Sequence, residues 1–150
     1  MYGGLKAARN FAVCFGDREK AERYNKAAEE VKAAAAKYLW SEKLGRFVRR
    51  LVPLDTPTPP EDTTYHEDVP LQHDDSDCKD FYEVDEVLDA SIYAIFKFHL
   101  FEADDPRVVA TMKAIEDRLW VKTDVGGVAR YENDYYHRIS NDIENVPGNP

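Results

Sequence analysis

The sequence has few of the features that mark secreted or membrane-spanning proteins. Only two of its 150 residues are cysteines, Cys14 and Cys78, which is too few for a disulfide framework. We therefore expect reduced thiols, the alternative being a single bridge. No apolar run approaches the roughly 18 residues that cross a bilayer, and the opening Met1-Tyr2-Gly3-Gly4 is unlike a charged-then-apolar signal peptide. These absences predict a cytoplasmic protein.

An excess of positive charge is also lacking. The chain has 20 Lys and Arg against 29 Asp and Glu, giving a formal net charge of -9 at pH 7. Such a surface repels nucleic acid and anionic membranes at long range, so we expect neither as a partner. The length is that of a single domain, and a hydrophobic content of 43% is enough to build a core.

No metal-binding pattern is recognisable in the sequence. The proline- and acid-rich segment from Pro53 to Asp80 contains many carboxylates, but it lacks the glycine and terminal glutamate of a calcium loop. His66, His73 and Cys78 do not show the paired close spacing of zinc ligands. We interpret the segment as a flexible or functional loop, and we expect no metal and no cofactor.

Helical periodicity, in contrast, is plain near the start of the chain. Apolar residues at three- and four-residue spacing predict a short helix without an N-cap from about Gly4 to Phe15, with Gly16 ending it. Its inward face would carry Leu5, Ala8, Phe11, Ala12 and Phe15. Asp17 is placed to cap a second helix, from about residue 18 to 39, whose alanine-rich face permits close approach by a neighbouring helix.

The pattern changes after this pair of helices and then returns. Residues 40–50 predict a small hairpin or extended arm. Apolar spacing from Tyr82 to His99 predicts a long buried helix, in which Asp89 must be satisfied by a capping or interhelical hydrogen bond. Asp105 followed by Pro106 predicts the start of another helix, ending near Trp120. Its core face would carry Val108, Val109, Met112, Ile115, Glu116 and Leu119.

These elements predict an all-α protein made of antiparallel helical hairpins, with a small hairpin or arm and long polar loops. Such hairpins either stack as a solenoid or close into a toroid, and periodicity alone does not choose between the two. The two pairs of helices share no sequence repeat that would favour a solenoid.

The stretch from Gly126 to Tyr136, continuing to Pro150, combines aromatic, acidic and amide residues with one arginine and has no helical or strand period. Such a composition is typical of a loop that lines a polar site. Tyrosine rings beside an arginine and carboxylates suit a ligand rich in hydroxyls, because the rings stack on C–H surfaces while charged groups bond the rims. The alternative is a solvated loop with a few anchoring tyrosines.

Within this stretch, Arg130-Tyr131, Asp134 and Tyr135-Tyr136, followed by Gly148-Asn149-Pro150, resemble the glucoamylase family of glycoside hydrolases, family 15. Two further stretches agree with it, Leu88-Asp89-Ala90-Ser91 with Ala103-Asp104-Asp105-Pro106-Arg107, and Tyr2-Gly3-Gly4-Leu5. The resemblance spans nearly the whole chain. It implies that residues 1–150 are the central part of an (α/α)6 toroid, whose loops at one end form a sugar pocket for inverting hydrolysis of an α-glucosidic bond.

The resemblance implies a substrate-binding role for this loop. Arg130 would bond sugar hydroxyls near the cleavage point, beside Tyr131, and Asp134 would orient Arg130 or bond a sugar directly. Tyr135 or Tyr136 would supply an aromatic wall. The alternative is that Arg130 and Asp134 form a structural ion pair that holds the loop. Glu132 stands where some family members have proline, which leaves its role open.

The family's two catalytic glutamates have no counterpart in this chain. One lies in a Trp-Glu segment before the equivalent of Tyr2, and the other follows the Gly-Asn-Pro motif. Inverting hydrolysis needs both an acid and a base, about 6.5 to 9.5 Å apart. Glu132, Asp134, Asp142 and Glu144 match neither, so we expect the catalysts to lie outside the chain.

Two functions follow from this reading. The first is a partial glucoamylase- or trehalase-type glycosidase that binds an α-glucan or a small α-glucoside. The second is a non-catalytic helical remnant that binds carbohydrate or acts as an interaction scaffold. In either case a partial toroid would expose apolar helix faces, which predicts self-association.

Overall fold

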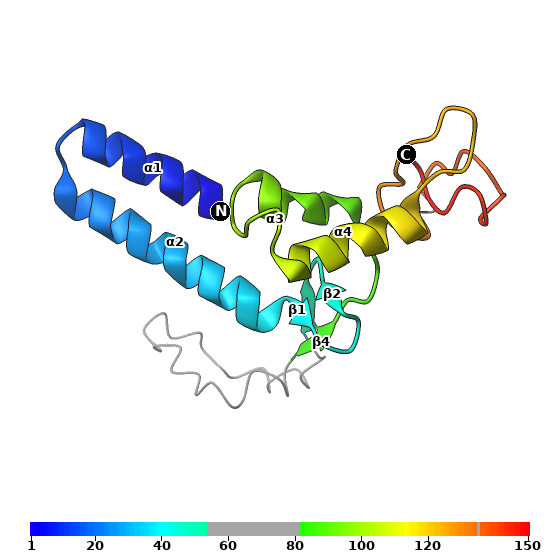
Figure 1. The fold of residues 1–150 in the computed structure, drawn as a ribbon, viewed down its shortest axis with the longest axis horizontal. Helices are drawn as coiled ribbons and strands as arrows, with labels where there is room; N and C mark the ends of the chain where they lie inside the picture. The colour runs from blue at the N-terminus through cyan, green and yellow to red at the C-terminus, as the bar shows by residue number, and fades with distance from the viewer. Residues whose placement is uncertain (54–81, 135) are drawn as a thin grey trace, which may run out of the picture.

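A computed structural model describes residues 1–53, 82–134 and 136–150. Its helices are α1 (Tyr2–Cys14), α2 (Arg18–Tyr38), the 3-10 helix η2 (Ala90–Tyr93), α3 (Ala94–Lys97) and α4 (Pro106–Leu119). The strands are β1 (Trp40–Ser41), β2 (Arg46–Phe47), β3 (Leu51–Pro53) and β4 (Tyr82–Val84). Figure 1 shows α1 and α2 side by side as a long hairpin. The strands, α3 and α4 lie at the open end of this hairpin, opposite the turn between α1 and α2, and irregular chain follows α4. The predicted loop from Pro53 to Asp80, with His66, His73 and Cys78, lies outside the described residues except for Pro53.

The helical hairpin confirms the predicted first pair of helices. Met1 provides no side-chain cap to α1, and Gly16 leaves the helix with a φ of +75°, a left-handed conformation that glycine adopts without strain. The Asp17 side chain then accepts a hydrogen bond from the backbone N–H of Lys20 at 3.0 Å. Buried alanines, among them Ala28 on α2, let the two helices pack closely. The predicted inward face of α1 is wrong at its C-terminal end, because Phe11 and Phe15 are exposed.

The predicted hairpin at residues 40–50 is also confirmed. Strand β1 pairs with β2 in antiparallel register, Trp40 opposite Phe47. A second two-stranded sheet, formed by β3 and β4, places Leu51 opposite Val84 and was not expected. In the part of the chain that the structure describes, helices are therefore accompanied by two small sheets, and the closed (α/α)6 arrangement stays a prediction.

The long helix predicted from Tyr82 to His99 is wrong. Its first residues form β4, and Asp89 is extended, with a φ of -137°. Only η2 and α3 are helical, and His99 follows them with a left-handed φ of 58°. Asp89 is nevertheless satisfied by capping, as expected, since its carboxylate accepts a hydrogen bond from the backbone N–H of Ser91 at 2.8 Å. The apolar spacing marked residues that are buried, such as Leu88 and Ile92, without marking their backbone conformation.

Helix α4 begins and ends close to its predicted limits. The Asp105 side chain accepts from the backbone N–H of Arg107 at 2.9 Å, and Pro106 occupies the first helical position. Val108, Ile115 and Leu119 are buried as predicted, whereas Val109 and Glu116 are exposed. Thr111 is buried instead. Its hydroxyl group can be buried because it accepts a hydrogen bond from the Phe47 N–H at 3.0 Å and donates one to the Arg107 carbonyl oxygen at 2.7 Å.

One apolar cluster joins α2, the β1–β2 hairpin, η2, α4 and the C-terminal loop. Its buried members are Ala35, Phe47, Leu88, Ile92, Phe101, Val108, Ile115, Leu119, Val121, Ala129 and Val146. The Phe47 ring stacks on Phe101 at a centroid distance of 5.1 Å and meets the Trp40 ring edge-on at 5.3 Å. Because Ala129 belongs to this cluster, the start of the C-terminal loop is anchored in the core. None of the helices in the described ranges is long and apolar enough to cross a membrane.

Candidate functional site

The C-terminal loop turns back on the end of α4 before it reaches Arg130. Trp120 forms an isolated antiparallel bridge with Val128. The Val121 N–H donates to the Gly127 carbonyl at 2.9 Å, and the Ala129 N–H donates to the Leu119 carbonyl at 2.8 Å. These bonds, together with the burial of Ala129, fix the backbone immediately before Arg130.

The Gly-Asn-Pro motif holds the same loop from the other side. The Arg130 N–H donates to the Asn149 carbonyl at 2.7 Å, and the Asn133 N–H donates to the Pro147 carbonyl at 3.1 Å. The Asn149 side-chain amide donates to the Tyr136 carbonyl at 2.6 Å. Asn149 of the motif, together with Pro147 just before it, therefore holds Arg130, Asn133 and Tyr136 in place.

Residues 88–90 provide a third attachment. Asp89 and Tyr131 form an isolated antiparallel bridge, and the Ala90 N–H donates to the Arg130 carbonyl at 2.9 Å. Glu132 closes this connection, since its N–H donates to the Leu88 carbonyl at 3.0 Å and its carboxylate accepts from the Leu88 N–H at 2.8 Å. The other carboxylate oxygen of Glu132 is ion-paired with Arg118. The role of Glu132, open from sequence, is to hold the loop.

Arg130 and Asp134 form the central pair of the site. The Nε and Nη2 atoms of Arg130 donate to the same oxygen, Oδ2 of Asp134, at 3.0 and 2.5 Å. Asp134 is fully buried, whereas the Arg130 side chain is 56% exposed. The Asp134 carboxylate thus fixes the guanidinium, while more than half of the Arg130 side chain stays exposed to solvent.

The surroundings of Asp134 keep it charged. Burial alone would raise the pKa of Asp134, but hydrogen bonds from Arg130, from the Tyr131 hydroxyl and from the Tyr136 N–H lower that pKa below its usual value. The hydrogen bond to Asp134 is also the main cause that raises the pKa of Arg130. The pair is therefore an ion pair at neutral pH, and donors from three residues bond the single buried carboxylate.

Tyr131 lies between this pair and a second set of charges. The Cζ atom of Arg130 is 5.1 Å from the centre of its ring, and the Cζ atom of Arg49 is 5.5 Å from it. Arg49 also bonds Asp85 through Nε at 2.8 Å and Asp89 through Nη1 at 3.3 Å. The sequence alone does not distinguish Arg49 or Asp85, because each has another residue of the same charge beside it, Arg50 and Glu86.

The remaining predicted site residues differ from one another in exposure and in contacts. Tyr136 is 70% exposed, with its ring edge against His137 at a centroid distance of 4.4 Å, so it is available for stacking. Tyr135 lies outside the described residues. Asp142 accepts hydrogen bonds from the backbone and side-chain nitrogens of Asn145, so it stabilises the local turn. Glu144 is exposed in the same turn.

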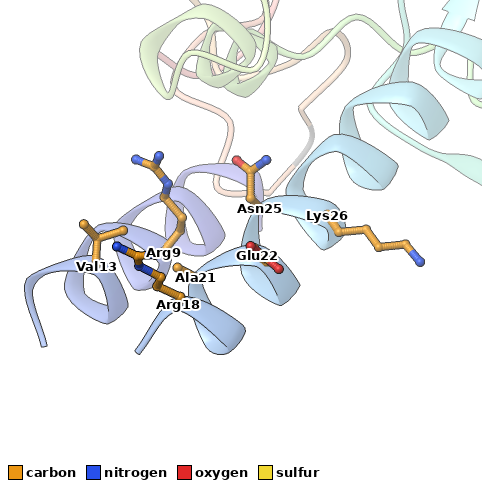
Figure 2. Close-up of a pocket in the computed structure, with 7 residues that line it drawn as sticks. All are labelled: Arg9, Val13, Arg18, Ala21, Glu22, Asn25 and Lys26. Atoms are coloured by element: carbon orange, nitrogen blue, oxygen red, sulfur yellow. The ribbon is translucent and has the colours of Figure 1, made fainter. Parts of the chain in front are cut away.

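Several pockets among the described residues lie away from Arg130. One of about 340 Å³ lies between α1 and α2. Figure 2 shows the side chains that line it, Arg9, Val13, Arg18, Ala21, Glu22, Asn25 and Lys26. Another, of about 410 Å³, is mostly apolar and lies between the start of α1, the end of α2 and α3. Within residues 1–53, 82–134 and 136–150, no group of three or more His, Cys, Asp or Glu side chains is arranged to hold a metal ion. Cys14 is an exposed free thiol.

The chain is similar in sequence to part of a known protein. No family model matches this chain, and no solved structure matches it. The chain is 27% identical over 136 residues to an uncharacterized glycosyl hydrolase of Methanocaldococcus jannaschii. That alignment covers 90% of this chain but 17% of the relative. Most of this chain is therefore similar to a small part of a much longer protein that is named as a glycosyl hydrolase.

Proposed function

We propose that this chain is part of an inverting α-glucosidase of the glucoamylase or trehalase type, and that residues 126–150 contribute substrate-binding side chains. The observation that carries the proposal is the Arg130 guanidinium, half exposed and held by the fully buried Asp134. The similarity to a glycosyl hydrolase supports the broader part of the proposal, a carbohydrate-active role. The (α/α)6 toroid, of which the α1–α2 hairpin would be one unit, belongs to the same proposal.

The geometry at Arg130 suits neighbouring sugar hydroxyls. Asp134 engages Nε and Nη2, and the planar guanidinium carries further N–H donors in a fixed arrangement. Because the ion pair already fixes the side chain, little conformational entropy is lost when a ligand binds. The exposed Tyr136 ring offers a face for the C–H surface of a pyranose. The ligand class is an α-glucan or a small α-glucoside.

Bond cleavage would need carboxyl groups from outside residues 1–150. In an inverting reaction one carboxylic acid protonates the leaving oxygen and a carboxylate activates water on the opposite face of the sugar. Glu132 is engaged by Leu88 and Arg118, and Asp134 by Arg130, so both are committed to holding the loop. The contribution of this segment is to bind and orient the sugar, and no cofactor enters the proposal.

The proposal is tested by titrating the chain with maltose and following amide and arginine Nε–Hε signals by NMR. We expect saturable shifts around residues 130–136 that are lost in Arg130→Met. Arg23→Met, at an exposed position on α2, is the matched control and should bind as the wild type does. Equal binding by Arg130→Met, or no response to maltose, trehalose or soluble starch, would contradict the proposal.

A second candidate is a non-catalytic scaffold, and two exposed aromatic residues favour it, Phe11 on α1 and Phe15 directly after it. Reducing-sugar release from maltose, starch and trehalose separates the two when it is measured on the chain alone and on a longer polypeptide that contains it. We expect none from the chain alone and hydrolysis from the longer polypeptide. Hydrolysis by the chain alone would show that its own carboxylates suffice, and inactivity of both would favour the scaffold.

A further inference from the structure

We propose that Arg49 is a positioning residue that orders the sugar-binding Arg130 through the ring of Tyr131. The inference rests on the proposed function of Arg130 but adds a residue from a distant part of the chain. Arg49 lies between β2 and β3, on the segment that follows the β1–β2 hairpin. Its Cζ atom is 5.5 Å from the centre of the Tyr131 ring, which the Arg130 Cζ atom approaches to 5.1 Å. One aromatic ring thus contacts both guanidinium groups.

Arg49 is held in place by two carboxylates. Its Nε donates to Asp85 at 2.8 Å and its Nη1 to Asp89 at 3.3 Å. The Arg49 side chain is 24% exposed, and both carboxylates are buried more deeply than it is. Burial lowers the pKa of Arg49, but the hydrogen bonds to Asp85 and Asp89 outweigh this and raise the pKa above its usual value. The guanidinium beside the ring is therefore charged at neutral pH.

Both carboxylates have other partners, so holding them is not the distinctive role of Arg49. Asp85 also accepts from Arg50 Nε at 2.7 Å and from the Val87 N–H at 3.0 Å. Asp89 also accepts from the Ser91 N–H. Arg50 shares Asp85 with Arg49 but is far more exposed. The contact with the Tyr131 ring distinguishes Arg49 from its neighbour and makes Arg50 a matched control.

Tyr131 passes this restraint on to Arg130 by two contacts. Its ring meets the Arg130 guanidinium, and its hydroxyl is hydrogen-bonded to Asp134, which raises the pKa of Tyr131. Asp134 in turn fixes Nε and Nη2 of Arg130. Fixing the Tyr131 ring thus limits the rotamers open to Arg130, and a ligand that needs one rotamer then loses less entropy on binding. Arg49 acts on the ligand through this ring and not by touching it.

The experiment compares Arg49→Met with Arg50→Met in the same chain. The readouts are the Arg130 Nε–Hε resonance without ligand, maltose affinity by titration, and the thermal midpoint. We expect Arg49→Met to broaden or shift the Arg130 resonance and to weaken maltose binding about two- to fivefold, the range that one cation–π contact supports. Arg49→Lys, which keeps the cation, should recover part of the affinity. Arg50→Met should leave both the resonance and the affinity unchanged.

Removal of the ring provides the second test. In a Tyr131→Leu background, Arg49→Met should cause no further change in the Arg130 resonance or in maltose affinity. Additive effects would overturn the proposal, as would an Arg49→Met variant that lowers the thermal midpoint while the Arg130 resonance and maltose affinity stay unchanged. An Arg50→Met variant that matches Arg49→Met would assign the effect to Asp85 instead. If wild-type chain binds no maltose but the Arg130 resonance still responds to Arg49→Met alone, positioning stands and the proposed function fails.

Discussion

A Cβ atom added at Gly148 would lie 2.2 Å from the backbone carbonyl oxygen of Tyr131 and 3.3 Å from the Cβ of Ala129. This close approach lets the backbone of residues 147–149 bond Arg130 and Asn133 from one side while residues 88–90 bond the same loop from the other. The position of Arg130 in the site therefore depends on the absence of a side chain at residue 148.

Gly148→Ala should destabilise the chain and loosen the Arg130 loop. The new methyl group meets backbone, which cannot move aside as a flexible side chain would, and overpacking of this kind costs about 1 to 3 kcal/mol. Urea denaturation followed by circular dichroism measures the change. Gly4→Ala is the control, because a Cβ there meets nothing within 4 Å and alanine favours a helix over glycine by about 0.5 to 1 kcal/mol. Equal stabilities for wild type and Gly148→Ala would show that the loop lies elsewhere in solution.

The buried hydroxyl of Thr111 should contribute more to the free energy of unfolding than its small size suggests. Thr111→Val keeps the shape of the side chain but leaves the Phe47 N–H without its acceptor. An unsatisfied buried donor costs about 1 to 3 kcal/mol, so the free energy of unfolding should fall by that amount. The reverse exchange, Val109→Thr on the exposed side of α4, should change it by no more than about 0.5 kcal/mol. Similar losses in both variants would contradict the assigned hydrogen bond.

Asp134 should make stability depend on pH in a defined direction. Its pKa is lowered in the folded protein, so the folded state releases the proton more readily than the unfolded chain does. The stabilisation is fully present above the unfolded-state pKa of about 3.9 and disappears as the pH falls through the lower folded pKa. Chemical denaturation at several pH values, with Asp134→Asn beside the wild type, should show a difference that is constant near neutrality and shrinks in acid.

The exposed Asp124→Asn exchange gives the matched control for that titration. It removes one carboxylate from the same C-terminal loop without touching Arg130, so its stability curve should run parallel to that of the wild type. A difference between wild type and Asp134→Asn that persists unchanged into acid would mean that the carboxylate contributes through packing and not through its charge.

The elements that the sequence predicted well are those set by neighbouring residues. Asp17 and Asp105 cap helices through their own following N–H groups, and Gly16 supplies a left-handed turn, so each can be read from a few adjacent positions. The predicted helix at Tyr82 to His99 failed because β4 pairs with β3, and Asp89 with Tyr131, across long stretches of sequence. Apolar spacing reports burial, and partners distant in sequence decide the conformation.

The same distinction holds for the candidate site: contacts between residues close in sequence could be predicted, and contacts between distant residues could not. Arg130 and Asp134 are four residues apart, and the sequence leaves three roles open for Asp134: it orients Arg130 toward a sugar, bonds a sugar directly, or forms a structural ion pair with Arg130 that holds the loop. The geometry joins the two residues, and their role toward a sugar stays a prediction. Arg49 could not be found, because nothing near Tyr131 in the sequence indicates which distant cation approaches its ring. The role of Asn149 likewise becomes clear only when residues 130 and 149 are seen to bond.

The exposed aromatic residues at the C-terminal end of α1 predict that the chain associates with itself. Phe11 and Phe15 are 67% and 83% exposed and lie four residues apart, Phe11 on α1 and Phe15 directly after it. Monomeric proteins seldom leave such a patch uncovered. Basic residues outnumber acidic ones in residues 1–39, which contain α1 and α2, and acidic residues outnumber basic ones in residues 40–150. The α1–α2 end of one copy is therefore matched in charge to the remainder of another.

Sedimentation velocity over a wide range of protein concentration should show a sedimentation coefficient that rises with concentration and falls back when salt is added, because the attraction between unlike charges is screened. The double exchange Phe11→Ser and Phe15→Ser should return the chain to a monomer. Val125→Ser removes a still more exposed apolar side chain from the loop after α4 and should leave association unchanged. A wild-type chain that sediments as one monomeric species at every concentration would show that these phenylalanines are tolerated in water without a partner.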